Sequence, residues 1–368
     1  MNFNLILFSG LSYRFIILIL LIIFPFKHEL QGVFGPLVYQ NADLDEYLYT
    51  KDLIFLNKSN INAFIENYIN ILDLNFDYDF RTITGPIYPL ILFVLNYNPN
   101  FPYLLALICF LSEIINFYLW SNYFRYKINN FYILFFSLMP IPLFFGFIHS
   151  SDIIYFLLST IIVLNLLNNQ KRNSIFYIVI LLIVFLRPAA LSVIFVLYLY
   201  DILKKNNFFN PSQIYYIVLF LIASIYYLPY FIIELNSEKV IMPYYFNNNY
   251  FIDLDLIDNL FLKKILIIFL KFFYTFGFDP TESGNSLVFY VRSLIAVIFI
   301  LGFFNTMFSK KLSFENLYIW ITIIFISLFL YPTYRYLIPV MPLLFLNFVI
   351  VIHRSRISYF LKKINSNF

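Results

Sequence analysis

The residues best suited to chemistry are the carboxylates of a polar loop, which runs from Lys27 to Gly85 between two apolar segments. Asp43, Asp45 and Glu46 open this loop, and eight of the chain's 20 acidic residues lie between Asp43 and Asp79. A carboxylate at a membrane surface can accept a proton as a general base, or hold a divalent cation through its oxygens. We therefore expect this loop to take part in the function.

The three acids of this run are predicted to have different roles. Residues two positions apart point roughly 200° apart on a helix, so Asp43 and Asp45 cannot both face one pocket. Asp43 with Glu46 has the spacing of a capping box, which makes Asp43 the expected N-cap and leaves Asp45 as the expected base. The alternative is that all three acids only cap and solvate a surface helix.

A second acidic position follows the third predicted span, where His149 and Asp152 come within four residues of each other. Ionisable residues at membrane depth are costly and usually face a cavity. Asp152 is thus a candidate second carboxylate that orients an acceptor or a metal. Asp152 could instead be the N-cap of the next helix, with Ser151 as the alternative cap.

Three arginines are candidates for binding an anion. Arg187 precedes a proline, Arg335 precedes Tyr336, and Arg81 lies just before Gly85. In the topology below, Arg187 and Arg335 fall at the outer membrane boundary, against the positive-inside trend, so an anion should compensate each of them. Guanidinium geometry suits bidentate binding of phosphate. The alternative is that both side chains extend to lipid headgroups.

The composition identifies the protein class. The chain is 62% hydrophobic and 12% charged, with a mean hydropathy of +0.81, which indicates an all-α polytopic membrane protein. The net charge of +4 is concentrated at loop ends, which argues against nucleic-acid binding. The single cysteine, Cys109, excludes an intrachain disulfide. The N-terminal apolar core after Arg14 has no small-residue cleavage site, so we expect a retained helix.

Windows of about 20 apolar residues predict the membrane spans. The region from Ser174 to Tyr200 is either one kinked span or a hairpin that turns at Arg187, which leads to about ten spans in a single transmembrane domain covering residues 1–368. The clear candidates are Leu5–Phe26, Phe101–Trp120, Phe131–Phe147, Ile153–Leu167, Ile214–Ile233, Leu287–Phe308, Tyr318–Leu330 and Leu337–Ile352.

The distribution of Lys and Arg predicts cytoplasmic termini, with residues 27–100 and 234–286 forming extracytoplasmic loops. This arrangement needs the hairpin and leaves Ile265–Phe278 along the outer surface. A rival topology makes Ser174–Tyr200 one span and Ile265–Phe278 another, and places Lys204 and Lys205 outside.

Within the first loop, two amphipathic helices are expected at the membrane interface, the second over Ile61–Leu72. Gly85-Pro86-Ile87-Tyr88-Pro89 then starts an apolar stretch that is too short to cross. We expect it to be re-entrant or interfacial.

These features together resemble the GT-C superfamily of membrane glycosyltransferases, which use sugars linked to polyprenyl phosphate. The resemblance lies in the acidic motif of the first outer loop, the Gly-Pro-Ile-Tyr-Pro segment, Asp152, the Arg187-Pro188 pair and Arg335-Tyr336. It implies an inverting transfer to a glycan, lipid or protein acceptor. We expect no soluble C-terminal domain of the kind that the larger members have, and the doubled acid leaves the base open between Asp45 and Asp43.

The resemblance also implies roles for the remaining candidates. The first-loop acid, Asp45, Asp43 or Glu46, would be catalytic, and the arginines would hold the donor phosphate. Any divalent cation, Mg²⁺ or Mn²⁺, would bind Asp45 and Asp152. The other substrate-binding candidates are His149, Tyr336, Arg81 and Tyr88.

Two other functions stay open. An O-antigen or capsule polymerase would also be polytopic, but its large outer loop generally comes late in the chain. A non-enzymatic transporter of lipid-linked glycans would have charged residues near the middle of the bilayer. Only Glu113, and Arg187 under the rival topology, fit this expectation. In every case the expected partners are membrane lipids and lipid-linked glycans, without nucleic acid, in a membrane that we expect to be a bacterial inner membrane.

Overall fold

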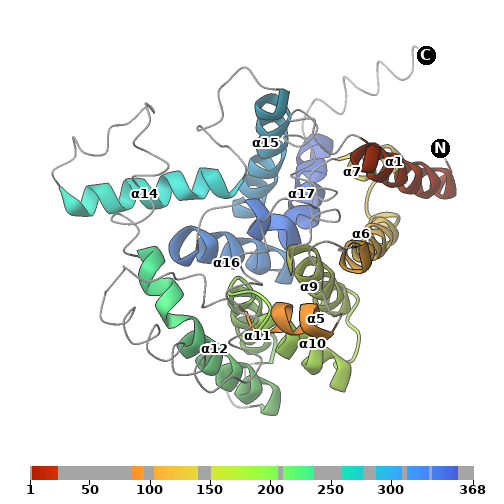
Figure 1. Ribbon diagram of the computed structural model, residues 1–368. Coiled ribbons are helices and arrows are strands. Elements are labelled where there is room, and N and C mark those ends of the chain that lie inside the picture. Colours follow the sequence, from red (N-terminus) through yellow and green to blue (C-terminus); the bar gives the residue numbers. More distant parts are fainter. Residues whose placement is uncertain are drawn as a thin grey trace.

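The computed structural model describes residues 2–23, 85–94, 103–139, 151–205, 210–235, 259–276, 287–308, 313–330 and 334–354. Every regular element in these ranges is a helix, which agrees with the all-α prediction (Figure 1). In chain order the helices are α1 (Phe3–Ile23), α5 (Ile87–Val94), α6 (Tyr103–Phe124), α7 (Asn130–Leu138), α9 (Ser151–Leu167), α10 (Ser174–Val184), α11 (Ala190–Lys205), α12 (Pro211–Leu235), α14 (Leu260–Thr275), α15 (Leu287–Met307), α16 (Phe314–Phe329), the 3₁₀ helix η3 (Tyr334–Val340) and α17 (Met341–Arg354).

Two helical stretches of the described chain are long and apolar enough to cross a membrane. They are Pro211–Leu228 in α12 and Tyr336–His353, which joins η3 to α17. Shorter apolar helices occur at Phe3–Ile19, Ser151–Leu167, Ser174–Val184, Ser293–Met307 and Phe314–Phe329. These helices coincide with the apolar windows of the sequence. The total of about ten spans is not established by them and stays a prediction.

One helix ends inside a predicted span. Within the window Phe131–Phe147, predicted to be a membrane span, α7 ends at Leu138 and Met139 has extended backbone angles. The next residue is Pro140, and the residue before a proline is disfavoured in the α conformation. The helix therefore ends before the proline, and the remaining residues of the predicted span, 140–147, lie outside the described part of the chain.

The region Ser174–Tyr200 forms two helices, α10 and α11, separated by the turn that contains Arg187. Arg172, just before α10, pairs with Asp201 near the end of α11. The start of α10 and the end of α11 therefore lie side by side, and the two helices run antiparallel. This region thus forms a helical hairpin with Arg187 at the closed end, as predicted, while the crossing of the membrane and the outer position of Arg187 stay predictions.

The C-terminal helices pack tightly. α15 packs against α17, and α16 contacts α11, α14 and η3. A Cβ atom on Gly302 of α15 would lie 2.1 Å from the main-chain oxygen of Leu344 in α17, so only glycine permits this approach. Figure 1 shows α14 extending to one side of the molecule, while α1, α6 and α7 lie at the opposite side.

Candidate functional site

Asp152 and Arg187 form a buried ion pair at the closed end of the α10–α11 hairpin. The Nε atom of Arg187 lies 3.2 Å from Oδ1 of Asp152, and both side chains are buried. Ser151 and Asp152 both lie in the first turn of α9, so the alternative in which either residue is the N-cap of this helix is wrong. Arg187 also does not extend to the surface, which excludes the headgroup alternative for this residue. The expected compensating anion is the Asp152 carboxylate.

The Gly-Pro-Ile-Tyr segment, named from the sequence, packs against the same turn. The main-chain N–H of Ile87 donates a hydrogen bond to the oxygen of Phe185, at 3.1 Å. A Cβ atom on Gly85 would lie 2.4 Å from the oxygen of Leu186, so glycine is needed for the contact. Tyr88 is 1% exposed within the core. α5, with eight residues, extends about 12 Å, as expected for a segment too short to cross.

Tyrosines from two further elements complete the site. The Tyr155 phenol of α9 interacts electrostatically with Asp152, with Tyr318 of α16 and with Tyr336 of η3. The buried hydroxyls of Tyr155 and Tyr318 both lie near the hydroxyl of Ser159, but none of the three makes a hydrogen bond of regular geometry within the described chain. Since buried polar groups are generally hydrogen-bonded, these hydroxyls are suited to bind a polar group of a ligand or an ordered water.

Other predicted site residues lie outside the described part of the chain. These are Asp43, Asp45, Glu46, Arg81 and His149, and for Arg335 only the main chain is described, next to Tyr336 in η3. Their convergence with Arg187 therefore stays a prediction.

The metal site also stays a prediction. Within the described ranges no cluster of three or more His, Cys, Asp or Glu side chains could hold a metal ion. The carboxylate of Asp152 is paired with Arg187, so a cation there would need ligands from the first loop, where Asp45 was proposed.

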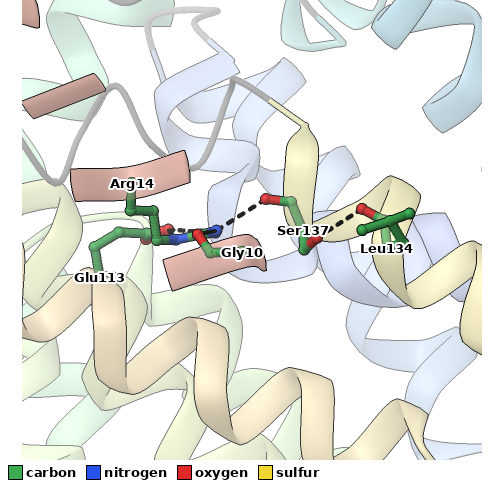
Figure 2. Close-up of polar contacts among 5 residues, drawn as sticks. All are labelled: Gly10, Arg14, Glu113, Leu134 and Ser137. Atoms are coloured by element: carbon green, nitrogen blue, oxygen red, sulfur yellow. Dashed lines mark hydrogen bonds and ion pairs between the residues drawn. The ribbon is translucent and has the colours of Figure 1, made fainter. Parts of the chain in front are cut away.

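A second buried ion pair, which was not predicted from the sequence, joins Arg14 of α1 to Glu113 of α6 (Figure 2). Arg14 donates from Nε and Nη2 to Glu113 Oε1, at 3.1 and 3.0 Å, and from Nη1 to the main-chain oxygens of Gly10 and Ser137. Its guanidinium carbon also lies 4.0 Å from the ring centroid of Phe117. Through these bonds Arg14 links α1 to Glu113 of α6 and to the main chain of α7.

The Arg14–Glu113 pair weakens the transporter alternative, for which Glu113 was the main support, because Glu113 has a structural partner. Both side chains are 1% exposed, and each compensates the charge of the other. Arg14 precedes the N-terminal apolar core in the sequence, and it lies within α1 in the structure. The signal that could have found the pair is the presence of one ionisable residue of each sign in two apolar windows.

The fold and the site together define a helical bundle with a buried guanidinium–carboxylate pair, bordered by tyrosines, at a helix-hairpin turn. Neither a family model, nor a curated protein, nor a solved structure is significantly similar to the chain.

Proposed function

We propose that the protein is a multi-pass membrane glycosyltransferase that moves a sugar from a polyprenyl-phosphate donor to a glycan, lipid or protein acceptor at the extracytoplasmic face. One observation carries the proposal. Four features that the sequence had singled out separately, the Gly85–Tyr88 segment, Asp152, Arg187 and Tyr336, belong to one neighbourhood around the start of α9.

A membrane location is supported by the surface of the helices. Large apolar side chains are exposed along them, among them Phe8 of α1, Ile225 of α12 and Leu294 of α15, at 68%, 64% and 61%. Exposed apolar surface on this scale suits contact with lipid chains. With the two membrane-capable stretches, it supports a bundle in the bilayer, for which we retain about ten spans and cytoplasmic termini as predictions.

The proposed reaction is a single displacement. The acceptor oxygen forms a bond to the anomeric carbon, the bond from that carbon to the phosphate oxygen breaks, and the polyprenyl phosphate leaves with the electron pair. The acceptor hydroxyl proton goes to the first-loop base, for which Asp45 is preferred to Asp43. Asp152 orients the guanidinium of Arg187 through Nε, and the Nη atoms would bind the phosphate and stabilise its charge as it leaves.

Binding of the leaving group tests this proposal without knowledge of the sugar. Purified protein is titrated with undecaprenyl phosphate and, separately, with undecaprenyl pyrophosphate, and binding is followed by native mass spectrometry. Arg187→Gln should weaken phosphate binding at least tenfold. Arg187→Lys should weaken it to a smaller extent, because an ammonium keeps the charge but lacks the bidentate fork. The control is Arg125→Gln, since Arg125 is exposed at the end of α6.

Three results would count against the proposal. Equal affinity of Arg187→Gln and the unchanged protein would remove the phosphate role of Arg187. Preference for the pyrophosphate would favour the polymerase alternative. Tight binding without transfer from any polyprenyl-phosphate sugar would favour the transporter.

A further inference from the structure

A separate polar pocket of about 450 Å³ lies at the open end of the α10–α11 hairpin. α9 is 17 residues long, so its two ends, and with them this pocket and the Asp152–Arg187 site, are about 25 Å apart. The pocket is therefore distinct from the site described above. Its lining residues are Leu166, Asn169, Gln170, Lys171, Arg172, Tyr177, Tyr200, Asp201, Lys204 and Ser212.

The chain that follows α9 forms one wall of the pocket in a defined conformation. Asn169 has a φ of 52°, and the N–H groups of Asn169 and Gln170 donate to the oxygens of Leu166 and Asn165. This is the Schellman arrangement that ends many helices. The Asn165 side-chain amide also donates to Oε1 of Gln170, at 3.1 Å, which orients the Gln170 side chain. The wall is thus held by hydrogen bonds of its own.

Arg172, which also lines the pocket, is held in place by an ion pair with Asp201. Its Nη2 atom donates to Asp201 at 2.6 Å, and its Nη1 atom donates to the Tyr216 hydroxyl at 3.0 Å and to Asp201. Asp201 is 1% exposed, so its charge is compensated inside the protein by Arg172.

Two further cations make the pocket electropositive. Lys171 and Lys204 both line it, both are exposed, and neither has an acidic partner within the described ranges. The nitrogen of Lys204 lies 5.6 Å from the ring centroid of Tyr200, which keeps the ammonium beside the pocket. With the Asp201 charge already neutralised, the pocket presents two positive charges together with amide and hydroxyl donors of Gln170 and Ser212. This set of groups suits a phosphate group.

Apolar side chains continue from the pocket along the outside of two helices. Ile175 and Ile178 of α10 are 65% and 54% exposed, and Ile214 and Val218 of α12 are 49% and 48% exposed. Tyr177 lies on α10 between the first two and lines the pocket. Tyrosine at the border of an apolar surface and a basic cluster is typical of the membrane interface.

We propose that this pocket binds a phosphate group, and specifically the headgroup phosphate of an anionic phospholipid whose acyl chains lie along α10 and α12. The lipid source follows from the exposed isoleucines, since a soluble phosphate would make no use of them. The inference rests on the membrane location proposed above, but not on the glycosyltransferase activity.

Native mass spectrometry of the purified full-length protein tests the pocket. Phosphatidylglycerol and phosphatidylcholine with the same acyl chains are added in separate titrations. Neutralising both lysines, in Lys171→Gln with Lys204→Gln, should weaken phosphatidylglycerol binding about ten- to thirtyfold. A matched control, Lys127→Gln with Arg125→Gln, removes two exposed cations at the end of α6 and should leave phosphatidylglycerol binding unchanged.

A steric variant checks the same site without changing its charge. Ser212→Trp should fill the pocket and weaken phosphatidylglycerol binding at least tenfold, while Ser212→Ala should not. Equal loss in the two double variants, or unchanged binding in Ser212→Trp, would overturn the assignment to this pocket. Competition by inorganic phosphate or glycerol phosphate at equal concentration would overturn the lipid as the source. Each of these outcomes is independent of the Arg187 titration.

Discussion

The Arg14–Glu113 pair leads to a prediction with an internal asymmetry. Replacing one partner of a buried ion pair generally costs about 3–5 kcal/mol, because the other charge is left uncompensated. In Glu113→Leu, Arg14 keeps its bonds to the Gly10 and Ser137 oxygens and its contact with Phe117. We therefore expect this variant to lose about 3 kcal/mol, at the lower end of the range.

The variant that removes the other partner, Arg14→Met, should lose more of the free energy of unfolding. The Glu113 carboxylate has its hydrogen bonds from Arg14 alone at Oε1, and Oε2 has no partner within the described chain. Arg14→Met therefore leaves a buried carboxylate without a donor, for which we expect a loss of about 5 kcal/mol. The double variant Arg14→Met with Glu113→Leu should return to within about 1 kcal/mol of the unchanged protein, because no unpaired charge remains.

The free energy of unfolding is measured by titrating the purified protein in mixed micelles with sodium dodecyl sulfate. Fluorescence of the two tryptophans, Trp120 in α6 and Trp320 in α16, follows the transition. The double-mutant cycle isolates the coupling between the side chains. A double variant as unstable as the sum of the single variants would refute the reasoning, since the two effects would then be independent. Equal losses in the single variants would refute the asymmetry.

Three further predictions concern close packing and the proposed base. Gly302→Ala should lose about 3 kcal/mol in the same titration, because its Cβ would meet the Leu344 oxygen, whereas Leu301→Ala on the exposed face should lose less than 1 kcal/mol. Gly85→Ala, whose Cβ would meet the main chain of the turn before α11, should weaken undecaprenyl phosphate binding through displacement of that turn, and unchanged binding would contradict this. Asp45→Asn should lower sugar transfer by about 10²–10⁴-fold with unchanged yield of membrane-extracted protein, and full activity would remove Asp45 as the base.

The sequence by itself determined the type and most positions of the helices. The apolar windows at Leu287–Phe308 and Tyr318–Leu330 correspond to α15 and α16. Helices follow from composition here because a main chain surrounded by apolar groups must satisfy its hydrogen bonds locally. Within the window Phe131–Phe147, α7 ends at Leu138 for an equally local reason, since hydropathy alone does not take account of the effect of Pro140 on the residue before it.

The tertiary structure decided which charged groups compensate one another. Glu113 and Arg187 could be recognised from the sequence as ionisable residues in apolar surroundings, but their partners are 99 and 35 positions away, at Arg14 and Asp152. No local pattern specifies such a pairing, because it depends on the rotation and depth of separate helices within the bundle. The same holds for the pocket beside Lys204, whose walls come from the ends of several helices that meet only after packing.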